Sequence, residues 1–396
     1  MEYQETRTVA AAEAAITTAG ARWRPHFRRS TAHRHACAYL RGLLSGAARK
    51  NGWQLAAETG YHQPRAIQRV LDRSVWDADA VRDDLRAYVV AELGDPAGVL
   101  VVDETGFLKQ GRKSVGVKRQ YSGTAGRIEN CQIGVFVGYA SPHGRAGLDR
   151  ALYLPQEWAD DAERRTAAGV PETTPFHTKP QLALTMLTRA LDGGVPVRWV
   201  TADEVYGGAG AFRHALEERG QAYVLAVKRT QAVTTFPPSQ PIGFWHADEL
   251  IAAQPPEAWQ RLSCGDGAQG ERVYDGAYVA LRPALCEGWM HGVLVRRSLS
   301  TPDELAYYLV YAPDQTAVPA IVRVAGTRWS SEDVFTLAKG QVGLDHYAVR
   351  SWQGWHRHMT LTLWALALLA VETARAKRGR PARATACRGV FQNCAA

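Results

Sequence analysis

Three carboxylates stand where a metal-dependent active site would need them. Asp103 follows the apolar run 99–102, and Asp203 comes shortly after the apolar run 195–200. Glu332 lies in a third segment, 327–339, of sequence TRWSSEDVFTLAK. Cleavage of a phosphodiester by two divalent ions needs carboxylates from separate segments that hold the ions roughly 4 Å apart. Acids at the carboxyl ends of strands are exposed at one edge of a sheet, so Asp103 and Asp203 are candidates for such a centre, and Glu332 is the candidate third acid.

Taken singly, each of these acids has an ordinary structural explanation. An aspartate after a strand is often a loop residue or a helix cap, and the helix dipole alone favours Glu332 in a first helical turn. Glu104 and Glu204 directly follow the two aspartates. Since adjacent strand residues point to opposite faces, we expect only one acid of each pair to face the ions.

The first part of the chain, 1–95, is predicted to be a helical DNA-binding domain. Within it, 53–59 and 64–73 read as two short helices around a turn at 60–63, which is a helix-turn-helix pattern. The second helix would present residue types that can contact phosphates or base edges in a major groove, namely Arg65, Gln68 and Arg69. A surface helix with solvated arginines is the alternative.

After this part, short apolar runs alternate with helical patterns, as in an α/β domain. An amphipathic helix at 179–191 precedes a strand at 195–200, a helix at 209–219 and a strand at 223–227. We expect the first part of a catalytic domain at 96–228, a mainly β insertion at 229–319, the second part of the catalytic domain at 320–374 and a basic tail at 375–396.

Composition narrows the class of protein. The chain has 396 residues, a formal net charge of +8 and six cysteines without C-x-x-C spacing. This pattern argues against a zinc knuckle or a disulfide framework, and the positive charge favours a polyanionic partner. No apolar run suggests a membrane span and the N-terminus lacks the pattern of a secretory signal, so we expect a cytoplasmic protein.

The chain resembles the bacterial insertion-sequence transposases of the DDE type. The resemblance extends over about 51–370 and is best in VVDETGFLKQGRKSVGVKRQYSGTAGRIENCQIGVF, TADEVYG and RWSSEDVFTLAKGQVGLDHYAVRSWQGWHRH. It implies a ribonuclease-H-like mixed α/β sheet with flanking helices, a mainly β insertion before the final glutamate and an N-terminal helical domain. It also implies that Asp103, Asp203 and Glu332 are the catalytic metal ligands.

In the branch of this family with the insertion, the third acid sits in a tyrosine, arginine, glutamate and lysine signature. Arg328, Glu332 and Lys339 match that signature, whereas Ala325 stands where tyrosine is expected. The resemblance implies that Arg328 and Lys339 grip DNA near the cut site. The departure at Ala325 affects a supporting contact to the DNA backbone and leaves the metal ligands in place.

Further residues are candidates for DNA contact. Trp329 could stack on an unpaired or flipped base, or could equally pack in a core. The basic and histidine side chains that follow would approach DNA, with ordinary surface or hydrogen-bonded side chains as the alternative: Arg350, His356, Arg357 and His358. Lys118 and Arg119, in the glycine-rich segment before the strand at 131–139, complete the predicted set.

By resemblance, the protein binds the terminal inverted repeats of its own element, hydrolyses a strand to expose a 3′ hydroxyl and directs that hydroxyl at target double-stranded DNA. Two Mg²⁺ ions per site are implied, with Mn²⁺ as a substitute, and synapsis of two ends implies a dimer in the DNA complex in a bacterial nucleoid. Two alternatives stay open. One is a domesticated or truncated copy that regulates without catalysis, since related chains often continue beyond the catalytic helices. The other is a nuclease that cuts without joining.

Overall fold

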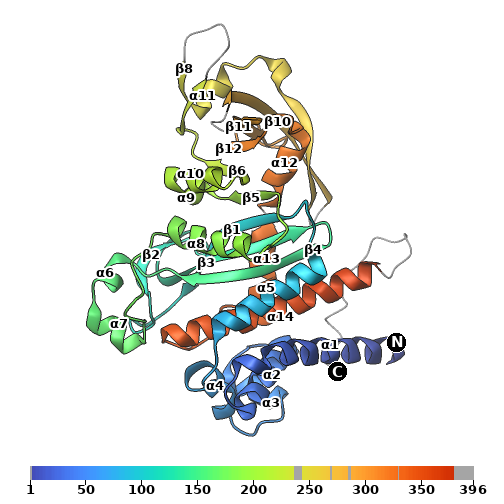
Figure 1. The fold of residues 1–396 in the computed structure, drawn as a ribbon, viewed down its shortest axis with the longest axis vertical. Coiled ribbons are helices and arrows are strands. Elements are labelled where there is room, and N and C mark those ends of the chain that lie inside the picture. The colour runs from blue at the N-terminus through green and yellow to red at the C-terminus, as the bar shows by residue number, and fades with distance from the viewer. Residues whose placement is uncertain (1, 236–242, 268–269, 284–286, 329, 379–396) are drawn as a thin grey trace.

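The structure is a computed structural model that describes residues 2–235, 243–267, 270–283, 287–328 and 330–378. Figure 1 shows a central sheet with the N-terminal helices at one end of the molecule and the strands of the 260–313 region at the other. The fold is mixed α/β, with helices flanking a large sheet of parallel and antiparallel strands. The predicted fold class is confirmed.

Helices fill the part of the chain before the first strand. Asn51 begins the third of these helices by accepting hydrogen bonds from the backbone N–H groups of Trp53 and Gln54, both at 3.0 Å. Gly60, with a φ of +78°, lies in the turn that follows. The two helices of the predicted helix-turn-helix are present as α3 and α4. The full set is α1 (Glu2–Trp23), the 3-10 turn Arg24–His26, α2 (Ser30–Leu44), α3 (Gly52–Glu58), α4 (Arg65–Asp72) and α5 (Ala78–Leu93).

One sheet of ten strands forms the centre of the described chain, in the order β2-β3-β1-β5-β6-β12-β11-β10-β9, with β4 paired to β3. β1 is antiparallel to β3 and parallel to β5, and β5 is parallel to β6. The strands of its first half are β1 (Val99–Leu108), β2 (Lys118–Ser122), β3 (Arg127–Ser141), β4 (Gly144–Leu152), β5 (Trp199–Ala202) and β6 (Ala222–Val227). The short runs of buried Val, Leu and Ala in β1, β5 and β6 are typical of strands covered on both faces.

The segment predicted as a mainly β insertion continues this sheet. β12 pairs with β6 in antiparallel register, so that the strands of the insertion extend the edge of the catalytic part. The elements are β7 (Ala232–Thr235), β8 (Gly243–His246), α11 (Ala247–Ala252), the 3-10 turn Pro256–Ala258, β9 (Gln260–Gly267), β10 (Gly270–Pro283), β11 (Trp289–Arg297) and β12 (Leu305–Pro313). β7 and β8 form a separate two-stranded ribbon.

Helices lie on both faces of the sheet. Ile321 and Val324 of α12 pack with Val101 of β1 on one face, and α13 and α14 lie across the strands next to that position. The remaining helices are α6 (Gln156–Ala159), α7 (Ala162–Ala168), α8 (Lys179–Asp192), α9 (Glu204–Gly207), α10 (Gly210–Glu218), α12 (Val318–Thr327), α13 (Ser330–Val342) and α14 (Trp352–Arg378). A full capping box at Thr178 and Gln181 begins α8.

The long helix α14 joins the N-terminal helices to the sheet. The indole N–H of Trp364 donates to the backbone carbonyl of Val81 at 2.9 Å, and Trp364 meets Trp23 edge to face. One hydrophobic core runs from the N-terminal helices through α14 to the sheet. Residues 375–378 of the predicted basic tail continue α14, and the rest of that tail lies outside the described residues. This shared core does not mark where one domain ends and the next begins, so the domain boundaries given above stay predictions.

Among the described helices, α14 alone is long and apolar enough, by length and composition, to cross a membrane. However, 67% of the most apolar 18-residue stretch of this helix is buried inside the protein. Its apolar side chains are explained by packing against α5 and β4. The length and composition of this helix therefore reflect a core position.

Candidate active site

Asp103 and Asp203 follow a pair of adjacent strand positions. β1 and β5 pair in parallel up to Val102 opposite Ala202, so the two aspartates are the next residues along both strands. Neighbouring strands lie about 4.8 Å apart. The prediction that β1 ends at Asp103 is wrong. β1 runs on to Leu108 because its pairing with β3 continues past the end of β5. The structure thus places these two predicted acids together at the carboxyl edge of β5.

Asp203 is held at the start of α9. Its carboxylate accepts a hydrogen bond from the backbone N–H of Val205 at 2.9 Å and caps the helix. Burial, with the negative charges of Asp103 and Glu104, raises the pKa of Asp203 to about 6. Crowded carboxylates of this kind fit a hard divalent cation such as Mg²⁺ or Mn²⁺, which prefers oxygen ligands and would relieve their repulsion.

The crowding makes a prediction about stability. In protein kept free of metal, Asp203→Asn is expected to raise the free energy of unfolding at pH 7.5 by roughly 1 to 3 kcal/mol, because one pKa unit is worth about 1.4 kcal/mol. The folded-state pKa of about 6 lies above the ordinary value of 3.8, so the charged carboxylate destabilises the fold. This cost is fully present above pH 6 and disappears as the pH falls below 4. Asparagine retains the ability to cap α9.

Urea denaturation in EDTA at pH 7.5 and at pH 3.5 measures the difference. The exposed neighbour Glu204 supplies the matched control, and Glu204→Gln is expected to change the free energy of unfolding by less than about 0.5 kcal/mol. An Asp203→Asn variant that is less stable than wild type at pH 7.5 would contradict the assigned crowding.

Glu104 is engaged by α8 and α9. Its carboxylate forms an ion pair with the Lys179 ammonium and accepts a hydrogen bond from the Tyr206 hydroxyl at 2.8 Å. Sequence reasoning missed both partners, since they lie 75 and 102 residues away along the chain. One signal was available: a lysine in the first turn of a helix opposes the helix dipole and calls for a nearby acid.

The third predicted acid, Glu332, stands apart from the two aspartates. It lies in the first turn of α13, its side chain is 62% exposed, and its carboxylate is 3.5 Å from the Arg328 guanidinium. Within the described residues, no group of three or more His, Cys, Asp or Glu side chains lies close enough to hold one ion. The structure therefore brings two of the three predicted ligands together.

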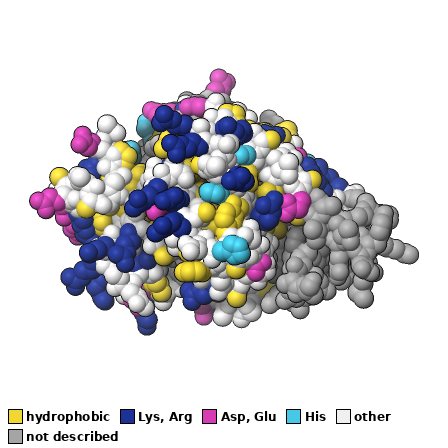
Figure 2. Space-filling view, turned by 90° about the horizontal axis from the view of Figure 1, so that it is seen from below, with side chains coloured by type: hydrophobic (Ala, Val, Ile, Leu, Met, Phe, Trp, Pro, Cys, Tyr) yellow, Lys and Arg dark blue, Asp and Glu magenta, His cyan; other side chains and the backbone are white. Residues whose placement is uncertain are grey.

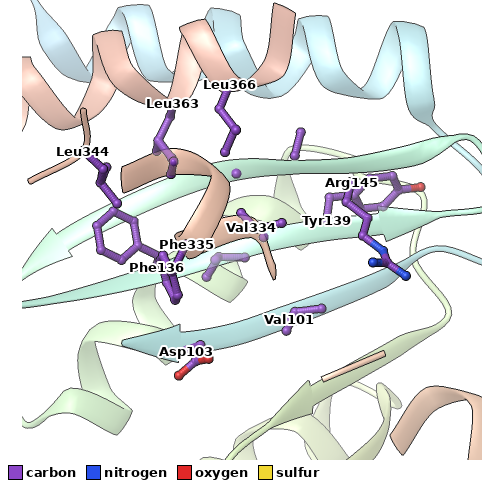
Figure 3. Close-up of a pocket in the computed structure, with 15 residues that line it drawn as sticks. Val101, Asp103, Phe136, Tyr139, Arg145, Val334, Phe335, Leu344, Leu363 and Leu366 are labelled. Atoms are coloured by element: carbon purple, nitrogen blue, oxygen red, sulfur yellow. The ribbon is translucent and has the colours of Figure 1, made fainter. Parts of the chain in front are cut away.

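The rest of α13 reaches the strand that carries Asp103. Figure 3 shows Asp103 at the edge of an apolar pocket that is also lined by Phe335 of α13 and by Leu363 of α14. Phe335 packs edge to face on Phe136, the residue opposite Asp103 in β3. Lys339, predicted to grip DNA, donates to the Thr124 hydroxyl at 3.1 Å. The helix that bears Glu332 is thus fixed over the sheet near Asp103.

A polar cleft of about 510 Å³ opens beside Asp203. Carboxylates and cations both line it. Asp203 and Glu204 contribute from the α9 side, and Asp303 from the insertion. The basic lining residues come from the end of β6, from β11 and from the end of α12: Lys228, Arg229, Arg296 and Arg328. Arg328, a predicted DNA contact, therefore faces the same cleft as Asp203.

Several other predicted DNA contacts are accessible. Arg65, Gln68 and Arg69 are exposed on α4. Figure 2 shows Lys and Arg side chains gathered on the face seen from below, over the N-terminal helices. Trp53 at the start of α3 is 67% exposed and was not among the predicted contacts. Elsewhere, Arg119 and Arg350 are exposed, and Lys118 on β2 forms an ion pair with Glu157.

The predicted DNA contacts on α14 are wrong for two residues. Arg357 is 1% exposed and donates to the backbone carbonyls of Val70 and Leu71 in the last turn of α4 and to that of Trp76 beyond it. His358 is fully buried between the Tyr39 hydroxyl and the Leu344 carbonyl. Both side chains hold the N-terminal helices against α14 and have no surface to offer DNA.

His356, on the same helix, is also drawn into protein contacts. Its ring nitrogen lies 2.9 Å from the Trp352 carbonyl, and burial beside the Arg150 charge lowers its pKa to about 3. A neutral histidine of this kind would supply no charge for a phosphate. Trp329, the predicted stacking residue, lies outside the described residues.

Comparisons with known proteins agree with the resemblance. A family described as "DDE superfamily endonuclease" matches residues 22–275, which contain both adjacent aspartates. The chain is also similar to a protein of Microchaete diplosiphon named "Probable transposase for insertion sequence element IS701", with 30% identity over 204 residues. That match covers 50% of this chain and 49% of the relative, so the chain spans about half the length of the curated relative it matches.

Proposed function

Because this chain belongs to the DDE superfamily endonucleases, we propose that it is an insertion-sequence transposase that cuts and joins DNA with Asp103, Asp203 and Glu332. The observation that carries the proposal is the pair of aspartates that follow paired positions on neighbouring strands, where burial and the charge of Asp103 raise the pKa of Asp203. Two carboxylates alone would repel the phosphate backbone of DNA. They suit a hydrolytic centre for DNA if they hold cations.

Asp103 and Asp203 would hold the divalent ions, and Glu332 would complete the set from α13. When bound, two Mg²⁺ or Mn²⁺ ions would polarise the phosphodiester and lower the pKa of the attacking water. The protein's own side chains would orient the strand. Water would be the first nucleophile and release a 3′ hydroxyl, which would then attack target DNA. This order requires no covalent bond between DNA and the enzyme.

The cations around this centre fit a phosphate backbone. Arg328 at the cleft, Lys339 on α13 and the exposed Arg119 and Arg350 would grip DNA near the cut, with Lys118 in reach if it leaves Glu157. We propose that α4 binds the terminal inverted repeats, that two chains assemble as a dimer on paired element ends, and that the protein works at the bacterial nucleoid.

The role of α4 can be measured through the salt dependence of binding. Arg65→Ala combined with Arg69→Ala is expected to weaken binding to a duplex with the native element end roughly tenfold to a hundredfold, and to lower the slope of log K against log salt by about 2. Fluorescence anisotropy in EDTA over a series of salt concentrations gives both values. Arg219→Ala, which removes an arginine just after α10 that pairs with Asp192 at the end of α8, is the control. An unchanged slope in the double variant would remove α4 from the interface.

The proposed function itself is tested with labelled DNA that carries the native element ends. Wild-type protein is incubated with Mg²⁺, with Mn²⁺ or with EDTA, and cleaved and joined strands are resolved separately. Both products are expected with either metal and neither with EDTA. Cleavage without joined product would make the protein a nuclease, and tight binding without either product would make it a regulator.

A further inference from the structure

The partly buried group formed by Glu104, Lys179 and Tyr206, here called the Glu104 clamp, links three elements around the two aspartates. Glu104 lies on β1 directly after Asp103, Lys179 begins α8, and Tyr206 lies in α9 directly beyond the residues that Asp203 caps. The Lys179 ammonium and the Tyr206 hydroxyl bind different oxygens of the Glu104 carboxylate. The clamp therefore ties the strand of one aspartate to the helix of the other.

The low exposure of these side chains requires that their polar groups pair with one another. The Tyr206 side chain is fully buried, and the side chains of Glu104 and Lys179 are 19% and 22% exposed. An acid placed this far from water is costly unless it is paired and hydrogen-bonded, and the clamp satisfies both of its oxygens. Lys179 also stands in the first turn of α8, where the helix dipole disfavours a cation. The pairing with Glu104 accounts for a lysine in that position.

Tyr206 links Glu104 to Asp203, because its hydroxyl binds Glu104 while the start of its helix binds the Asp203 carboxylate. Asp203 accepts from the Val205 backbone N–H at 2.9 Å, so its carboxylate orientation follows the first turn of α9. That turn has little freedom on its other side, because a Cβ added at Gly207 would come within 2.0 Å of the Ala226 carbonyl oxygen of β6. α9 is thus wedged between β6 and the Glu104 clamp.

We propose that the Glu104 clamp positions Asp203 next to Asp103 and keeps Glu104 itself from binding the ions. The inference rests on the proposed function, since it assigns a role around the same two aspartates. Lys179 and Tyr206 become positioning residues that act through Asp203. The rival possibility is that Glu104 is a direct ligand. The affinity for the ions would then depend on the charge of Glu104 and not on its contact with Tyr206.

The test is direct binding of Mn²⁺ to the metal-free full chain, without DNA, followed by the electron paramagnetic resonance signal of free Mn²⁺. Tyr206→Phe keeps the ring and removes only the hydroxyl. We expect it to weaken Mn²⁺ binding about tenfold, the lower end of the range for residues that orient metal ligands. Glu104→Gln keeps an oxygen that can accept from Tyr206 and is expected to stay within about threefold of wild type, whereas Glu104→Leu loses about tenfold or more.

Controls separate positioning from loss of fold. Arg375→Gln breaks an ion pair with Glu92 far from the site and is expected to bind Mn²⁺ as wild type does. Circular dichroism must give each variant the wild-type spectrum and a melting temperature above that of the assay. In cleavage assays, Tyr206→Phe should need about tenfold more Mg²⁺ and recover at saturating metal.

The outcomes distinguish the inference from the proposed function. Wild-type affinity in Tyr206→Phe, or equal losses in Glu104→Gln and Glu104→Leu, would overturn the Glu104 clamp and leave the aspartates in place. If Asp103→Asn binds Mn²⁺ as well as wild type does, the proposed metal centre fails and the inference falls with it.

Discussion

Replacing Asp103 with asparagine is expected to lower DNA cleavage by at least about a thousandfold, which corresponds to roughly 4 kcal/mol of lost transition-state stabilisation. Asparagine keeps the size of the side chain and removes the charge that would hold a divalent ion. Asp103 lies on a strand that is paired along its whole length, so the backbone has no reason to rearrange. The measurement is single-turnover cleavage of a labelled element end in Mg²⁺, with anisotropy to confirm that the variant still binds DNA.

The neighbouring acid Glu204 provides the matched control. It lines the cleft beside Asp203 but is exposed, and Glu204→Gln is expected to cleave within a few-fold of wild type. Cleavage by Asp103→Asn at more than a tenth of the wild-type rate would remove Asp103 from the metal centre. A loss of DNA binding in the same variant would point instead to a structural defect.

Arg150 is expected to be among the residues on which the fold depends most. Its side chain is 1% exposed, donates to Asp79 of α5 and Thr360 of α14, both at 2.9 Å, and lies 3.6 Å from the Asp149 carboxylate. Removing one partner from a buried ion pair leaves a charge without compensation. Arg150→Met is therefore expected to lower the free energy of unfolding by about 3 to 5 kcal/mol.

Urea denaturation followed by circular dichroism measures the loss. Arg375→Met serves as the control because its ion pair with Glu92 is half exposed, and such pairs contribute about 0 to 1 kcal/mol. A loss below about 1 kcal/mol in Arg150→Met would mean that Arg82 and Arg189, which also pair with Asp149, hold the network without it.

Local patterns in the sequence were sufficient for much of the fold. Helical spacing located α3, α4 and α8, and runs of Val and Leu located β1 and β6, whereas β5 at Trp199–Ala202 only overlaps the end of the strand predicted at 195–200. The end of β1 was misplaced because its continuation depends on β3, a partner that local periodicity does not reveal. The adjacency of Asp103 and Asp203 followed from strand order, which the family resemblance supplied and periodicity did not.

The misassigned residues share one cause. Arg357 and His358 read as DNA contacts because charged and aromatic residues cluster in WHRH. Their true partners are backbone carbonyls and a hydroxyl about 280 to 320 residues earlier in the chain. The Glu104 clamp was missed for the same reason. Contacts of this range are fixed by how helices pack on the sheet, and a single sequence carries little trace of them.

The core that α14 shares with the N-terminal helices and the sheet would fix how far from its binding sequence the protein cuts an element end. Arg357 fastens the end of α4 to the same helix that covers the sheet, so no flexible linker sets the distance from α4 to Asp103. The spacing between the recognised bases and the cut bond would then be a dimension of the protein itself. One extra base pair between them would shift the cut by about 3.4 Å and rotate it by roughly 35° about the duplex axis. Such an insertion should displace the cut by one nucleotide, or prevent it, instead of being absorbed.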